Sequence, residues 1–132
     1  MMAARMAHRS KRLLALSVFV VIAFALVWNF SEAKTNARWL LLSRRYKSAV
    51  YAQPTPTDGE FKHIEWDGWG WGGQDTTVYL VFDQANSLSL AASTHLSGKF
   101  VGIPCEVPKV SRLESQWYAV TFYTNQDWGR CN

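Results

Sequence analysis

The sequence has only two cysteines, Cys105 and Cys131, among its 132 residues. Cysteines this far apart exclude a CxxC redox pair and a zinc site with closely spaced thiolate ligands. They leave two alternatives, a disulfide or two buried thiols. A disulfide would close a loop of about 26 residues and stabilise the fold by roughly 3.5 kcal/mol in a chain-entropy treatment. We predict the disulfide, and with it an oxidising compartment for this part of the chain.

Acidic residues are absent from the first 31 positions, and Glu32 is the first of them. Residues 1–52 hold nine Lys or Arg against this one acid, a net charge of +8. Residues 53–132 hold five against nine acids, a net charge of −4, and the two parts sum to +4. The basic character belongs to the N-terminal part, and the acidic remainder argues against a phosphate-binding face and against nucleic acid as a partner.

No charged side chain interrupts the 18 residues from Leu13 to Phe30, whose only polar members are Ser17 and Asn29. A helix of this length covers about 27 Å, close to the roughly 30 Å hydrocarbon core of a bilayer. We predict a transmembrane helix that acts as a signal anchor, with the basic residues 1–12 in the cytoplasm and the rest of the chain outside it. Cleavage after Ala33, where small residues occur, is the alternative and would release a soluble domain.

A segment without proline or glycine follows, and residues 31–52 are predicted as a juxtamembrane helix. Its apolar residues recur at helical spacing, at Trp39, Leu42, Tyr46, and Ala49 or Val50. In one interpretation this helix continues the span and packs Leu40 to Leu42 on lipid or on the domain. In the other it lies on the membrane surface, with its cations on anionic headgroups or on the acidic domain. Those cations are Arg44, Arg45 and Lys47.

Residues 53–60 are typical of a linker, with two prolines, a glycine and no apolar side chain. A single domain, residues 61–132, is expected to follow, and Pro108 indicates an edge position for one of its strands. We predict four strands, Phe61–Trp66, Thr76–Asp83, Val107–Leu113 and Gln116–Thr124, and a short helix from Asn86 or Ser87 to Leu96. This order predicts an α+β fold, in which an N-terminal transmembrane helix precedes a small antiparallel sheet with one packed helix.

Tryptophans gather in one glycine-rich stretch, WDGWGWGG at residues 66–73. Its Asp-Gly pair indicates a hairpin turn. Trp66, Trp69 and Trp71 would form an aromatic platform if their flat indole faces are exposed for stacking on sugar rings or aromatic ligands. The alternative is that they fold inward and complete a small core. The stretch is not a phosphate-binding loop, because the required Gly-Lys-Ser/Thr ending is absent.

Three polar residues, His63, Glu65 and Asp67, alternate along the preceding strand and would project from one face. Imidazole with carboxylates is the chemistry of a metal site or of an acid–base pair, although a solvated strand face shows the same alternation. The candidate binding residues are therefore His63, Glu65, Trp66, Asp67, Trp69 and Trp71. No catalytic, metal or cofactor set is predicted, because the serines of the domain have no recognisable nucleophile elbow or base partner.

Five strings in the second half of the chain carry a family resemblance. They are KHIEWDGWG, YLVFD, GIPCEV, RLE followed by QWY, and FYTNQDW. Together they resemble a group of small single-pass bacterial membrane proteins of unassigned function, over about residues 46–132. The resemblance implies one domain with a spanning segment, and it implies no activity or site residue.

The sequence therefore predicts a membrane-anchored extracytoplasmic module of the cell envelope that acts by binding or interaction. Its expected partners are membrane lipid and an envelope protein or glycan. A metal-dependent or acid–base hydrolase using His63, Glu65 and Asp67 is one alternative. A structural subunit of a membrane complex, with the juxtamembrane helix as the contact, is the other.

Overall fold

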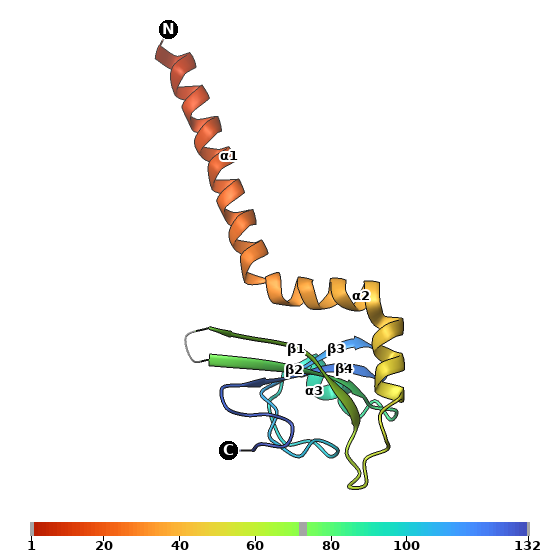
Figure 1. Cartoon of the computed structure of the whole chain (residues 1–132). Helices are drawn as coiled ribbons and strands as arrows, with labels where there is room; N and C mark the ends of the chain where they lie inside the picture. The colour runs from red at the N-terminus through yellow and green to blue at the C-terminus, as the bar shows by residue number, and fades with distance from the viewer. Residues whose placement is uncertain (1, 72–73, 132) are drawn as a thin grey trace. The chain divides into compact units, whose positions relative to one another are not determined.

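The computed structural model describes the backbone of residues 2–71 and 74–131, and the side chains of these residues except 2–10, Ser31 and Trp71. It divides into two compact units, residues 1–41 and residues 42–132 (Figure 1). The fold is α+β, as predicted, with helices, a four-stranded antiparallel sheet and a short helix in the order α1, α2, β1, β2, α3, β3, β4.

Helix α1 runs from Met2 to Trp28 and contains residues 13–28 of the apolar run, so it ends two residues before the predicted end of the transmembrane helix. Within the described residues, Lys11–Trp28 is the one helical stretch long and apolar enough to cross a membrane, and none of it is buried. A signal sequence would share these properties. A turn at Asn29 separates α1 from α2, which runs from Phe30 to Tyr51. Ala33, the cleavage position of the alternative interpretation, thus lies within a helix, where its amide donates to the Asn29 carbonyl at 2.9 Å.

The sheet has the spatial order β1-β2-β4-β3, and every neighbouring pair is antiparallel (Figure 1). Its strands are β1 Lys62–Trp71, β2 Gln74–Phe82, β3 Lys109–Glu114 and β4 Trp117–Tyr123. The third strand is an edge strand, as Pro108 predicted. Strand β1 is longer than predicted and passes through the expected turn at Asp67, because its pairing with β2 continues as far as Trp71, opposite Gln74.

Helix α3 is shorter than predicted and covers only Ser89–Thr94. The Asp83 carboxylate accounts for its late start, because it accepts hydrogen bonds from the Ala85 amide at 3.1 Å and the Leu88 amide at 2.8 Å. The Ser87 hydroxyl also donates to it, at 2.9 Å. These bonds hold the preceding residues in a turn. His95 ends the helix in a left-handed conformation, with a φ of 53°.

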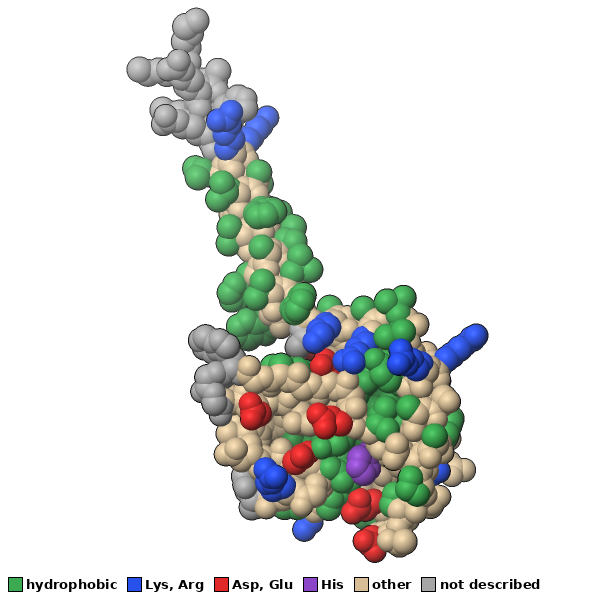
Figure 2. Space-filling view, viewed as in Figure 1, with side chains coloured by type: hydrophobic (Ala, Val, Ile, Leu, Met, Phe, Trp, Pro, Cys, Tyr) green, Lys and Arg blue, Asp and Glu red, His purple; other side chains and the backbone are tan. Residues whose placement is uncertain are grey.

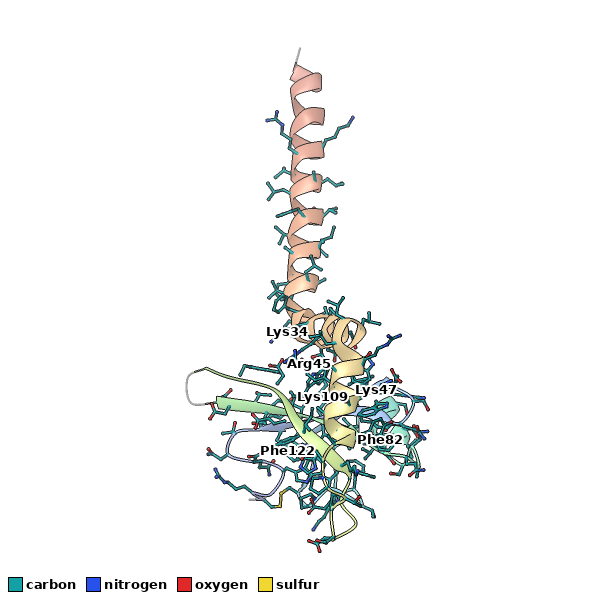
Figure 3. The ribbon with its side chains drawn as sticks, turned by 45° about the vertical axis from the view of Figure 1, so that its right-hand side comes forward. Lys34, Arg45, Lys47, Phe82, Lys109 and Phe122 are labelled. Atoms are coloured by element: carbon teal, nitrogen blue, oxygen red, sulfur yellow. A yellow bond between two sulfur atoms is a disulfide. The ribbon has the colours of Figure 1, made fainter. Side chains whose placement is uncertain are left out.

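Both faces of the sheet are covered. The face that carries Tyr79 and Val81 packs in one buried cluster with α3 and the later loops; its other main members are Leu88, Ala91, Val107, Tyr118, Val120, Phe122 and Trp128. On the opposite face the last residues of α2 lie over Phe82 and Trp117, since the Tyr51 ring lies 5.2 and 5.5 Å from these two rings (Figure 3). Val50 is fully buried in this layer.

The compact unit therefore begins at Leu42, within the segment predicted as juxtamembrane helix. Tyr46 and Val50 follow the predicted inward stripe, whereas Leu42 is 41% exposed. The Lys47 ammonium forms an ion pair with Glu114 of β3. One of the two expected roles of the basic residues, pairing with the acidic domain, is thus seen for Lys47.

Candidate functional site

The C-terminal segment is fastened to the domain by a disulfide and by one tryptophan. Cys105 and Cys131 are bonded, with their Cα atoms 5.1 Å apart, which confirms the predicted pairing. Trp128 is 6% exposed and belongs to the core. Its indole Nε1 donates to the Glu60 carboxylate at 2.9 Å, so the end of the chain is tied to the start of β1.

His63 is part of this fastening. Its ring stacks on Trp128, with centroids 3.7 Å apart and planes inclined by 21°. Its Nδ1 lies 2.9 Å from the Phe61 carbonyl oxygen, and donation to that oxygen fixes the ring orientation. The imidazole is therefore positioned by packing, as a structural residue would be.

The register of β1 separates the three polar residues that were expected on one face. His63 lies opposite Val81 and Glu65 opposite Tyr79, both on the α3 side of the sheet. An irregularity between Glu65 and Asp67 then sets Asp67 opposite Val78, on the other face. Among the described side chains, no group of three His, Cys, Asp or Glu could hold a metal ion.

Sequence reasoning did not select the polar pair of Tyr79 and Asp127. The Tyr79 hydroxyl donates to the Asp127 carboxylate, and the Trp128 amide donates to the same carboxylate at 2.8 Å. Burial first, and then the hydrogen bond and the charge of Asp127, raise the pKa of Tyr79 well above its usual range. The pair closes the polar end of the core and keeps the phenol neutral.

The three tryptophans of the predicted platform do not share one environment. Trp66 is 5% exposed and meets the Tyr46 ring edge to face at 5.7 Å, so it belongs to the layer between α2 and the sheet. Trp69 is 45% exposed. The side chain of Trp71 lies outside the described residues.

Trp69 belongs instead to a row of three side chains that crosses the sheet. It lies opposite Thr76 of β2, and Thr76 lies opposite Tyr123 of β4. Directly opposed residues of antiparallel strands point to the same face, so the three side chains line up side by side. We call Trp69, Thr76 and Tyr123 the aromatic row.

The aromatic row has the dimensions of a stacking site. Strands lie about 4.8 Å apart, so the backbones of Trp69 and Tyr123 are separated by about 10 Å, with the short Thr76 side chain between them. Tyr123 is 43% exposed. The Thr124 amide donates to the Asp75 carbonyl at 2.8 Å, which holds the end of β4 against β2. Two half-exposed rings therefore flank the buried Thr76 on a fixed backbone.

The next row of side chains on the same face has a charged residue at each end. Asp67 lies opposite Val78, which lies opposite Thr121, which lies opposite Lys109. A carboxylate and an ammonium thus lie on a row two residues along the strands from the aromatic row. Aromatic faces beside such groups suit a ligand with apolar ring faces and hydroxyl groups.

No known protein family, curated protein or solved structure matches this chain. The resemblance stated from the sequence therefore stays a prediction.

Proposed function

We propose that this protein is a membrane-anchored extracytoplasmic module that binds a glycan or another ring-bearing ligand of the cell envelope. The aromatic row is the observation that carries the proposal. Its Trp69 and Tyr123 rings are exposed although a core of this size could bury them, as it buries Trp66 and Trp117.

The proposed location rests on the two ends of the chain. An exposed apolar helix at residues 11–28 has the length of a membrane span or a signal, and the disulfide favours an oxidising compartment. We infer that the helix stays attached as an anchor and that residues after it lie outside the cytoplasm. A reporter fused to the C-terminus should then be active only outside the cytoplasm, and Cys105 should resist thiol labelling until a reductant is added.

The proposed ligand follows from the chemistry of the row. A pyranose ring has an apolar face that stacks on indole or phenol, and its hydroxyls accept and donate hydrogen bonds. Asp67 and Lys109 lie on the same face of the sheet as the two rings. A pyranose ligand can use both the rings and these charged groups, whereas a flat aromatic ligand would use mainly the rings.

The test is a titration of the full chain in detergent with soluble oligosaccharides of envelope type, amino-sugar oligomers included. Trp69→Ala and Tyr123→Ala should each weaken binding by about fivefold or more, since one stacking contact contributes about 1 kcal/mol. Leu90→Ala is the matched control, because Leu90 is 68% exposed and lies on α3.

Three readouts decide the outcome. Circular dichroism should show that the Trp69 and Tyr123 variants keep the fold. Trp66→Ala should instead lower the free energy of unfolding by about 3 kcal/mol or more, because it removes a buried indole. Equal affinity of the Trp69, Tyr123 and Leu90 variants, or no binding of any oligosaccharide by the native chain, would refute the glycan site.

A further inference from the structure

We propose that the disulfide between Cys105 and Cys131 is an exchange site, at which the Cys131 sulfur reacts with the thiolate of another molecule. The inference goes beyond the proposed glycan site and does not depend on it. It gives the disulfide a chemical role in addition to its stabilising one. Four observations on the domain carry it.

The two bonded residues differ in accessibility. Cys105 is 1% exposed and belongs to the buried cluster, whereas Cys131 is exposed. In thiol–disulfide exchange a thiolate attacks one sulfur of the bond directly, and access decides which sulfur is attacked. An attack from solvent therefore falls on Cys131, and Cys105 is the sulfur that leaves.

The structure already holds a hydrogen-bond acceptor for the sulfur that leaves. The Cys105 sulfur lies 3.6 Å from the Trp128 carbonyl oxygen. A thiol is a weak donor, and a buried donor that lacks an acceptor destabilises the fold. Once the leaving thiolate has taken up a proton, the Cys105 thiol can donate to this oxygen without a movement of the chain.

The chain on each side of the bond is held by other contacts. Gly98 and Val107 exchange two backbone hydrogen bonds of 3.0 and 2.8 Å, which hold the loop that carries Cys105. Trp128 stays in the core through its burial and through its bond to the Glu60 carboxylate. Only the short segment after Trp128 gains freedom when the disulfide opens, so the reduced chain can keep its core and be oxidised again.

Local charge favours a reaction at Cys131. Residues 53–132 carry a net charge of −4, and Figure 2 shows acidic side chains on the visible face of the domain. Such a surface repels an incoming thiolate. The residue next to Cys131 is the exposed cation Arg130. A neighbouring guanidinium attracts an anion and stabilises a thiolate, so the exposed sulfur lies beside a favourable charge.

The exchange balances in atoms and electrons. The incoming thiolate forms a bond to the Cys131 sulfur, the bond to Cys105 breaks, and its electron pair leaves with the Cys105 sulfur, which takes a proton from water. Attack by Cys105 on the mixed disulfide reverses the step. A second thiolate of the same partner can attack the partner's own bonded sulfur instead. The partner dithiol is then oxidised to a disulfide, and Cys105 and Cys131 together gain two electrons and two protons.

The first measurement is the rate at which dithiothreitol, a small dithiol, reduces the native full chain in detergent. Samples are alkylated at intervals, and mass spectrometry counts the free thiols. The rate in buffer should lie within about tenfold of the rate in concentrated urea, and urea below the unfolding transition should leave it unchanged. A bond that opens only on global unfolding would be reduced about 10³-fold more slowly or less in buffer, with a rate that rises steadily with urea; that result would overturn the inference.

Single-cysteine variants identify the sulfur that reacts. In Cys105→Ser, the Cys131 thiol should form a mixed disulfide with oxidised glutathione at least about tenfold faster than the Cys105 thiol does in Cys131→Ser. Equal rates in variants that circular dichroism shows to be folded would refute the assignment to Cys131. If either variant fails to fold, the first measurement still decides, because it uses the native chain.

The charge argument has its own matched pair of variants. Arg130→Gln, made in the Cys105→Ser chain, should slow the reaction with oxidised glutathione about threefold, because it removes the cation beside the thiolate. Arg45→Gln is the control, since it removes an equally exposed arginine on α2. Equal rates for the two variants would refute the role assigned to Arg130.

A protein dithiol then identifies the source of the thiolate. Reduced thioredoxin is the probe, and its rate is compared with that of dithiothreitol at the same dithiol concentration. Faster reduction by thioredoxin indicates a protein partner, and faster reduction by dithiothreitol indicates a small thiol; both support exchange at Cys131. Reduction of the folded chain by neither reagent would overturn the inference.

Discussion

Removal of the C-terminal part of α2 should unfold the domain, although the sequence places this segment outside it. A fragment of residues 61–132 contains the whole predicted domain, whereas a fragment of residues 42–132 contains the compact unit of the structure. The two fragments differ only by the last ten residues of α2 and the linker that follows.

The expected loss can be built from the contacts of those ten residues. Val50 is fully buried, and burial of a valine side chain contributes about 1.5 to 3 kcal/mol. The ring pairs of Tyr46 with Trp66 and of Tyr51 with its two partners in the sheet add about 0.5 to 1.5 kcal/mol each. The sum, about 3 to 8 kcal/mol, is comparable to the whole stability of a small domain.

Urea denaturation of the two oxidised fragments, followed by near-ultraviolet circular dichroism, checks this prediction. Residues 42–132 should show a cooperative transition, and residues 61–132 should show little fixed aromatic signal in the absence of urea. Within the longer fragment, Val50→Ala should cost about 2 kcal/mol, whereas Ser48→Ala on the exposed side of the same helix should cost almost nothing. Equal midpoints for the two fragments would show that α2 is only a connector and would overturn the argument.

Three further changes test the core and its end. Asp83→Ala should lower the free energy of unfolding by about 3 kcal/mol or more, because it leaves two amides and a hydroxyl without their acceptor; a loss under about 1 kcal/mol in urea denaturation would contradict this. Reduction of the disulfide between Cys105 and Cys131 should lower it by roughly 3.5 kcal/mol, and an unchanged midpoint with reductant would show that the loop is held by other contacts. The raised pKa of Tyr79 favours the neutral phenol in the folded state, so its contribution is complete below pH 10 and is lost as the pH rises above that. Tyr79→Phe should therefore flatten the alkaline decline of stability, and an identical decline in both proteins would refute this cause.

The sequence predicts β2 and β4 well because their alternation is long and both faces are apolar. It predicts β1 poorly because glycine occurs both in turns and within strands where another chain segment approaches closely. An Asp-Gly pair usually marks a turn, but here Gly68 and Gly70 lie within a paired strand, opposite Thr77 and Asp75. A Cβ on Gly70 would come within 2.2 Å of the Asp75 carboxylate, so the glycine permits a close approach.

The candidate site shows more clearly that a single sequence does not reveal the register of a strand. Alternation predicts that His63, Glu65 and Asp67 share a face, and one irregularity in the register moves Asp67 to the other side. An irregularity of this kind has no dependable signal in a single sequence. The aromatic row was missed for a related reason, because Trp69 and Tyr123 are 54 residues apart and only strand order brings them together.

Helix α2 shows how one short charged stretch can serve two purposes. Arg44, Arg45 and Lys47 are close in the sequence and alike in charge, so composition assigns them one role. The Lys47 ammonium pairs with Glu114 of β3, whereas Arg44 and Arg45 are exposed. The ion pair is half-exposed and contributes little stability, but it fixes which side of the helix faces the domain. The role of a cation in this stretch is therefore set by its partner in the sheet, which neither composition nor spacing gives.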